Sequence, residues 1–150
     1  DGRSSAVGID LSASDEKEVK LPTRVLGLSG VKAGVAALAA GVKHVIAITS
    51  TGQLFSWGDG SYGQLGHGDT STVMLPRLVS YLKSKKIVTA AAGEEHSLAS
   101  AFEGECYSWG SGSFGKLGHG DAQDEATPRQ LNTISDKHVT AVSCGYAHSA

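Results

Sequence analysis

The stretch that decides the fold is SWGDGSYGQLGHGD at residues 56–69, because it returns 52 residues later as SWGSGSFGKLGHGD at residues 108–121. Eleven of its 14 positions are identical in the two copies. A fixed period of this order is typical of repeat architectures, in which each unit buries its apolar face against the next unit. We therefore aligned the rest of the chain at the same offset of 52 residues.

The same offset of 52 residues links positions outside the stretch. Segments 41–92 and 93–144 align without a gap, and residues 145–150 begin a third copy that stops in the middle of an expected strand. Segment 1–40 fits the period loosely, so we expect it to be a degenerate or partial blade, with a polar surface excursion at 12–20. The recurring residues are Gly41, Gly93 and Gly145; His44, His96 and His148; Trp57 and Trp109; and Pro76–Arg77 with Pro128–Arg129.

Each repeat is predicted to hold about four short strands. Residues 87–92 form an unbroken apolar run, as does segment 35–40 earlier in the chain, which favours strands buried on both faces. A turn then leads to a strand at 96–101, and Glu103-Gly104 has the spacing of a two-residue hairpin turn. A β-rich segment, a glycine-rich loop and a proline-containing edge strand complete the repeat at 106–109, 110–121 and 128–131. The pattern predicts an all-β fold of propeller blades.

Composition excludes several other classes. The chain has 150 residues, is 40% hydrophobic and 19% charged, and carries a formal net charge of -2. No run of 18 apolar residues is present, so no membrane span is expected. The start at Asp1 carries neither an initiator Met nor a signal-peptide pattern, so we expect the chain to begin inside a longer protein. Cys106 and Cys144 are too few for a disulfide framework and favour reduced thiols in an intracellular compartment, cytoplasmic or nuclear.

The motifs G-x-x-H, SWG-x-G-x-x-G-x-LGHGD and PR, taken together over 41–150, resemble the repeat of the regulator of chromosome condensation family. This resemblance implies a seven-bladed β-propeller, of which the chain would supply part. It also implies that the recurring residues are mainly structural. These signature residues are Gly41, His44, Trp57, Gly58, Gly63 and Gly66 in one copy, Gly93, His96, Trp109, Gly110, Gly115 and Gly118 in the next, and Gly145 and His148.

Three chemical interpretations of the motifs compete with this structural one. Residues 58–63 spell G-x-G-x-x-G, but a dinucleotide-binding loop opens a helix after a strand, and no helical pattern follows here. The repeated histidines are separated by whole sheets and form no local ligand pair, so no metal site is expected, and we interpret them as buried or half-buried and bonded to loop backbone. No catalytic residues and no cofactor are predicted. The lysine run at 83–86 is followed by several glutamates and is interpreted as a solvated loop, which makes nucleic-acid binding unexpected.

Function is therefore expected to reside on a surface. The resemblance implies that the two residues inside each G-x-x-H motif project from one face, giving a partner-binding face of Val42, Lys43, Glu94, Glu95 and Tyr146. Paired glutamates beside an aromatic ring would suit a basic protein partner.

Three functions remain open at this level. The first is a protein-interaction module in a larger scaffold, ubiquitin ligase, kinase or trafficking protein. The second is guanine-nucleotide exchange on a small GTPase, which other blades would have to support. The third is ultraviolet-B photoreception, which is disfavoured because Val42, Glu94 and Tyr146 stand where the resembling plant receptor carries tryptophan.

Overall fold

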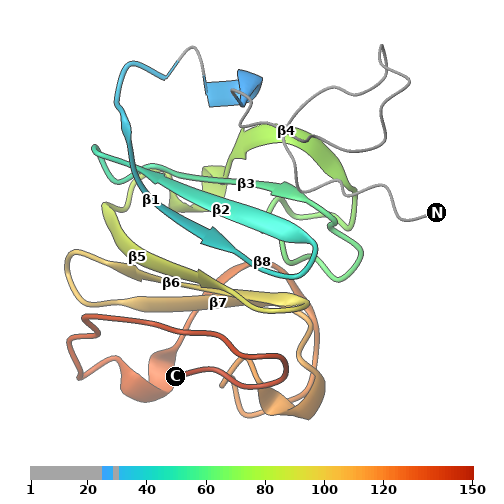
Figure 1. Ribbon diagram of the computed structural model, residues 1–150. Helices are drawn as coiled ribbons and strands as arrows, with labels where there is room; N and C mark the ends of the chain where they lie inside the picture. The colour runs from blue at the N-terminus through green and yellow to red at the C-terminus, as the bar shows by residue number, and fades with distance from the viewer. Residues whose placement is uncertain (1–24, 29–30) are drawn as a thin grey trace.

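The computed structural model describes residues 25–28 and 31–150. It contains two four-stranded antiparallel sheets, each a simple up-and-down meander, stacked face to face (Figure 1). The predicted excursion at 12–20 and most of the partial blade at 1–40 lie outside the described residues. The first sheet consists of β1 (Val35–Ala40), β2 (His44–Thr49), β3 (Leu54–Gly58) and β4 (Val73–Leu78), and the second of β5 (Ile87–Ala92), β6 (His96–Ala101), β7 (Cys106–Gly110) and β8 (Glu125–Gln130).

Short 3-10 turns lie between or beside these strands. No helix in the described part of the chain is long and apolar enough to cross a membrane. One of the 3-10 turns follows the last strand of each sheet, at the point where the chain leaves that blade. The four turns are η2 (Leu26–Leu28), η3 (Ser80–Leu82), η4 (Ser113–Gly115) and η5 (Asn132–Ile134).

The blades are out of phase with the sequence repeat by one strand. Repeat 41–92 holds β2, β3 and β4 of the first blade and then β5, which pairs with β6 in the second blade. A sequence repeat has no fixed starting residue, so its boundaries can be drawn at any position along the chain. The hydrogen bonds between antiparallel strands, by contrast, determine which strands belong to one sheet. The third copy forms no strand, and its backbone pairing is a single bridge between Cys144 and Ser149.

The main core lies between the two sheets. Ile46, Ile48 and Leu54 of the first sheet pack with Tyr107 and Trp109 of the second, and all five side chains are buried. The interior strands β3, β6 and β7 are buried along their whole length. This packing is what makes the two sheets adjacent blades.

The expectation that segments 35–40 and 87–92 are buried on both faces was wrong. β1 is exposed at nearly every position, and β5 is buried at Ile87 and then half-buried, with Val88 exposed. Both are edge strands of their sheets, so each has one ladder partner. An alanine-rich run is equally apolar in an interior strand and at an edge, so hydropathy alone did not separate the two cases.

A hydrogen-bonded clamp joins the blades. The Ser97 hydroxyl of β6 donates to the carbonyl oxygen of Gln64 at 2.8 Å, and the indole nitrogen of Trp109 donates to the same oxygen, also at 2.8 Å. Nε2 of His44 lies 2.8 Å from the Ser97 oxygen. Because the hydroxyl proton is already donated, Nε2 of His44 must carry the proton in this bond.

The clamp repeats one blade later. The Ser149 hydroxyl donates to the carbonyl oxygen of Lys116 at 2.6 Å, and Nε2 of His96 lies 3.1 Å from the same hydroxyl. These histidines therefore bond to a serine of the following repeat rather than to loop backbone as expected. His44 and His96 are fully buried, whereas His148 is exposed, contrary to the prediction.

Candidate protein-interaction face

One end of the two-blade unit gathers most of the loops that the sequence singled out. In an up-and-down meander, the connections β1–β2 and β3–β4 fall at the same end of the sheet, as do β5–β6 and β7–β8. Backbone bonds tie them together, from Asp59 N to the Lys43 carbonyl at 2.9 Å and from Ser111 N to the Glu95 carbonyl at 2.8 Å. We call this end the loop face, made of residues 41–43, 59–72, 93–95, 111–124 and 145–147.

The five predicted face residues all lie on the loop face. Val42 and Tyr146 are 63% and 70% exposed, and Lys43 is exposed as well. Glu94 and Glu95 are half-buried. The loops of adjacent blades touch, since Val42 N donates to the carbonyl oxygen of Gly93 at 3.3 Å.

Packing explains the spacing of the G-x-x-H motif. A Cβ on Gly41 would collide with the Gly93 carbonyl and would lie 2.9 Å from Cε1 of His44, so the imidazole closes directly over the glycine. Burial, and then the nearby charge of His96, lower the pKa of His44 to about 4. Burial, and then the charge of Lys116, lower the pKa of His96 to about 4. Both rings are therefore neutral at pH 7 and support the loops structurally.

The two glutamates of the face have different surroundings. Nζ of Lys116 lies 3.7 Å from Oε2 of Glu95, and the Lys116 side chain is only 4% exposed. Glu95 is thus the counterion of a buried lysine, so it contributes to stability as well as to surface charge. A hydrogen bond from the Tyr146 hydroxyl to Glu94 raises the pKa of that tyrosine. Glu94 is therefore the better of the two for testing binding.

Charge is distributed unequally between the two ends. The loop face carries two lysines, Lys43 and Lys116, against six carboxylates at Asp59, Asp69, Glu94, Glu95, Asp121 and Asp124. The opposite end, which we call the turn face, comprises residues 50–53, 79–86, 102–105 and 131–138. Its charges are four lysines at Lys83, Lys85, Lys86 and Lys137 against three carboxylates at Glu103, Glu105 and Asp136.

The lysine run at 83–86 lies on the turn face, and part of it is engaged within the chain. Lys85 forms an ion pair with Glu105, and Nζ of Lys86 lies 4.8 Å from the centre of the Phe102 ring.

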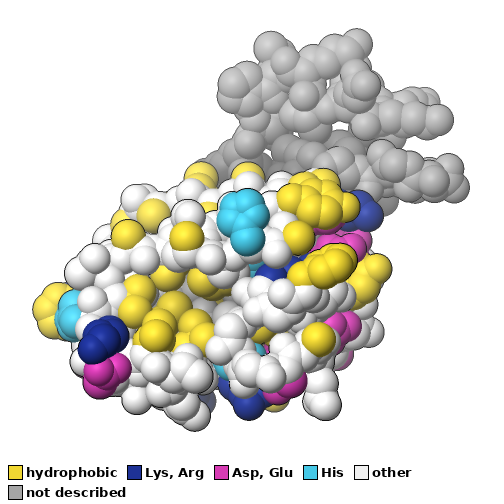
Figure 2. Space-filling view, turned by 90° about the horizontal axis from the view of Figure 1, so that it is seen from below, with side chains coloured by type: hydrophobic (Ala, Val, Ile, Leu, Met, Phe, Trp, Pro, Cys, Tyr) yellow, Lys and Arg dark blue, Asp and Glu magenta, His cyan; other side chains and the backbone are white. Residues whose placement is uncertain are grey.

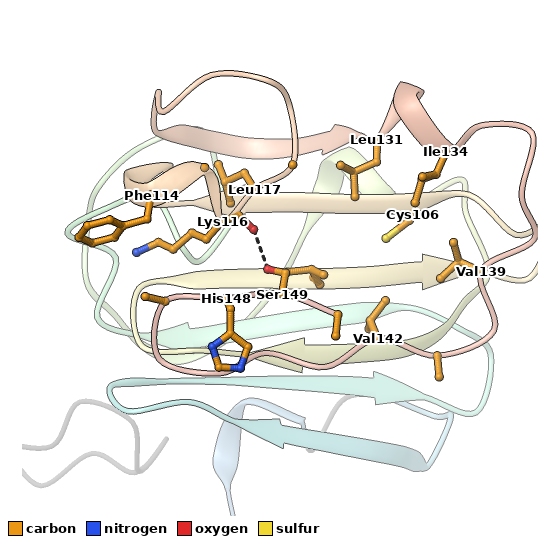
Figure 3. A pocket seen from close by; sticks show the side chains of 16 residues that line it. Cys106, Phe114, Lys116, Leu117, Leu131, Ile134, Val139, Val142, His148 and Ser149 are labelled. Atoms are coloured by element: carbon orange, nitrogen blue, oxygen red, sulfur yellow. Dashed lines mark hydrogen bonds between the residues drawn. The ribbon is translucent and has the colours of Figure 1, made fainter.

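Sequence reasoning missed two aromatic residues on the loop face. Tyr62 and Phe114 occupy the same position of the two glycine-rich loops and are 43% and 88% exposed. Figure 3 shows the Phe114 ring on the same side as the Lys116 ammonium. The available signal was the recurrence of an aromatic residue between loop glycines, where no strand pattern buries it.

A cavity of about 490 Å³ lies between the second sheet and the C-terminal residues. Its wall is mostly apolar, with Leu98, Cys106, Leu117, Leu131 and Val142 among its lining residues, and Figure 2 shows hydrophobic side chains gathered in a hollow on this side. Burial raises the pKa of the Cys106 thiol, and raises that of Cys144 to about 12, so both thiols are protonated at neutral pH. Within the described residues, no group of three or more His, Cys, Asp or Glu side chains could hold a metal ion.

Comparison with known proteins places these blades in a family. The model of the regulator of chromosome condensation (RCC1) repeat matches residues 51–100 and 103–150, and a second model of this repeat matches 35–64 and 87–116. The chain is 38% identical to the human E3 ubiquitin-protein ligase HERC2 over 127 residues. These aligned residues cover 85% of this chain and 3% of HERC2. It is 31% identical over 139 residues to the ultraviolet-B receptor UVR8 of Arabidopsis thaliana, 93% of this chain and 31% of the receptor.

Solved structures agree with these matches. Prp20p of Saccharomyces cerevisiae, in a structure described with its binding to Gsp1p and histones, superposes with a TM-score of 0.72 at 27% identity over 79% of this chain and 31% of Prp20p. Yeast RCC1 (Prp20) bound to Kap60 superposes with a TM-score of 0.79 at 25% identity over 98% of this chain and 35% of that chain. The chain spans about a third or less of each of these relatives. It consists of two adjacent blades of a β-propeller, and it belongs to the family of regulator of chromosome condensation (RCC1) repeat proteins.

Proposed function

We propose that the loop face docks a protein partner with a basic surface, and that the chain serves as the interaction module of a larger intracellular protein, such as a scaffold or a ubiquitin ligase. The observation that carries this proposal is the combination, on one end, of exposed Val42 and Tyr146 with a surplus of carboxylates. Exposed aromatic and apolar anchors provide binding energy, and complementary charge selects and steers the partner.

The relatives support this type of role. HERC2 is an E3 ubiquitin-protein ligase, and Prp20p is described as binding Gsp1p and histones. Histones are strongly basic proteins, so they offer a defined probe for an acidic face.

The test is Glu94→Lys in the intact protein, with binding to histones measured at low salt. We expect affinity to fall by about tenfold or more, because the change places a like charge opposite a basic partner. The matched control is Glu103→Lys, an exposed glutamate on the turn face, which should leave affinity nearly unchanged. Equal losses from both variants would show a non-specific charge effect, and an unchanged Glu94→Lys variant would remove the loop face from the interface.

Guanine-nucleotide exchange is the second candidate, supported by the similarity to Prp20p and its binding of Gsp1p. It is tested by whether the intact protein accelerates release of labelled GDP from Gsp1p. Photoreception is not proposed, because Val42, Glu94 and Tyr146 replace the tryptophans implied by the receptor resemblance, and Trp57 and Trp109 are buried in the core.

A further inference from the structure

We propose that the cavity beside the second sheet is a binding site for one tryptophan side chain, presented by a β-strand of another polypeptide, with the indole N–H donating to the carbonyl oxygen of Lys116. The cavity lies against the face of the second sheet that points away from the first sheet. The inference therefore concerns a different surface from the docking site proposed above and does not depend on it.

The junction between the two sheets shows what an equivalent space holds. Trp109 is fully buried there, and its indole nitrogen donates to the carbonyl oxygen of Gln64 at 2.8 Å. The Ser97 hydroxyl donates to the same oxygen at 2.8 Å. One loop carbonyl of the first repeat thus accepts two bonds from the second repeat, one from a serine and one from a tryptophan.

The carbonyl oxygen of Lys116 is the equivalent acceptor one repeat later, and it accepts one of these two bonds. The Ser149 hydroxyl donates to it at 2.6 Å, as the dashed line in Figure 3 shows. No second donor to this oxygen is present among residues 25–28 and 31–150. A carbonyl oxygen has two lone pairs, so Lys116 can accept a further donor at the position that Trp109 takes at Gln64.

The walls of the cavity repeat the apolar surface that packs with Trp109. That ring belongs to one buried core cluster, and five members of the cluster have a cavity-lining equivalent 52 residues later. The pairs are Ile46 with Leu98, Leu54 with Cys106, Val79 with Leu131, Leu82 with Ile134, and Ile87 with Val139. The volume of about 490 Å³ lies within the range of small-molecule sites, about 300–1,000 Å³.

A glycine keeps the position of the ring clear in both repeats. A Cβ on Gly66 would lie 2.9 Å from Nε1 of Trp109, so a side chain there would collide with the indole. Gly118 is the equivalent residue, and a Cβ there would meet only Cδ2 of Leu131, at 2.8 Å, among the described residues. The space that the indole takes at the first junction is therefore kept free of side chains at the second.

A tryptophan on a strand satisfies all of these features together. An aliphatic or phenyl side chain would cover the apolar wall but bring no donor to the Lys116 carbonyl. A serine or amide side chain would bring a donor but leave the wall uncovered. The indole combines a large apolar ring with one N–H donor, and Trp109 of β7 shows that a strand delivers it to this geometry.

The first experiment measures binding of 5-fluoroindole and 5-fluorobenzothiophene to the 150-residue protein by fluorine NMR. The two probes have nearly the same shape, but sulfur replaces the N–H donor in the second. We expect 5-fluoroindole to have the lower Kd, by about two- to tenfold, because it alone donates to the Lys116 carbonyl. Equal Kd values, or no binding of 5-fluoroindole, would overturn the proposal.

A variant locates the site. Val142 is a half-buried residue that lines the cavity, so Val142→Phe should fill part of it and weaken binding of 5-fluoroindole by about fivefold or more. The matched control is Val88→Phe on β5, which is 41% exposed and does not line the cavity, and which should leave the Kd unchanged. Circular dichroism checks that both variants fold. Equal effects of the two variants, or no effect of Val142→Phe, would place the probe elsewhere and overturn the proposal.

A peptide tests whether the occupant is a strand. A peptide with the sequence of residues 105–111, which contains the β7 segment with Trp109, should displace 5-fluoroindole from the protein. The same peptide with 3-benzothienylalanine in place of tryptophan should displace it about two- to tenfold less well. Failure of the tryptophan peptide to displace the probe would show that the site takes small aromatic molecules only, and would overturn a strand as the occupant.

Discussion

At the residue scale, equivalent glycines of the two repeats have unequal surroundings. Gly63 has a φ of +77°, and a Cβ there would lie 2.6 Å from Cα of Ala126 in the next blade. Gly115 has a φ of +68°, but a Cβ there would meet nothing within 4 Å among the described residues. Both glycines meet a conformational requirement, and only Gly63 also meets a packing requirement.

Gly63→Ala should therefore destabilise the protein more than Gly115→Ala. The positive φ alone costs alanine about 1–2 kcal/mol at either site. Gly63→Ala adds a backbone collision that requires the blades to shift. Urea denaturation of both variants measures the difference. Equal losses would show that the contact with Ala126 is relieved without cost.

The buried histidines make stability depend on pH. His44 and His96 have pKa values of about 4 in the folded protein, against about 6.5 when unfolded. The unfolded chain therefore binds more protons between these values, so stability is complete above about pH 6.5 and falls as pH drops towards 4. Each histidine contributes at most about 3 kcal/mol to this loss. The urea midpoint should fall steadily as the pH is lowered from 7.5 to 4.5, and His44→Gln should make this pH dependence less steep. A midpoint that stays constant over this window would contradict the prediction.

At the element scale, each blade is bound to its neighbour by residues from two strands and one loop. Trp109 of β7 and Ser97 of β6 both donate to the Gln64 carbonyl in the loop after β3. The contact therefore combines burial of a large ring with a polar clamp, and the two contributions are separable by mutation.

Trp109→Ala should cost roughly 3–5 kcal/mol, because the side chain is fully buried between the sheets. Ser97→Ala should cost about 1–3 kcal/mol, because it removes one bond to the Gln64 carbonyl and leaves buried Nε2 of His44 without its partner. Chemical denaturation ranks the two variants. A melting temperature for Trp109→Ala within a degree or two of the parent would contradict burial of the ring between blades.

At the scale of the whole molecule, the two faces of the second sheet are covered to different degrees. The face towards the first sheet is packed, whereas the other lines the 490 Å³ cavity with Leu98, Leu117 and Leu131 among its walls. On the first sheet, edge strand β1 exposes Val35 at 45% and Leu38 at 67%. Exposed apolar side chains on an edge strand drive association.

The 150-residue chain on its own is therefore expected to self-associate. Sedimentation velocity should show the weight-average mass rising with concentration, because edge strand β1 exposes apolar side chains at Val35 and Leu38. The control is the same measurement with Leu38→Ser, a change at an exposed position of β1, which should reduce association. A monomer that unfolds in one cooperative transition in dilute solution would contradict the expectation.

The sequence alone determined the features that depend on local chemistry and on internal repetition. The 52-residue period, the strand and turn sites, and the need for glycine at the positive-φ loop positions Gly58 and Gly63 follow from residue types along the chain. These features identified the family and its propeller fold. The family resemblance implied that the residues inside the G-x-x-H motifs share one face, and the meander of each blade places their loops at one end.

Only the tertiary structure decided the contacts made across blades. It set the boundary of each sheet one strand away from the repeat, paired His44 with Ser97 of the next repeat, and made Glu95 the counterion of buried Lys116. It also turned Phe114 outward while the equivalent Tyr62 is less exposed. The physical reason is that burial and hydrogen bonding depend on neighbours in space, and two nearly identical sequence repeats acquire different neighbours once they are stacked.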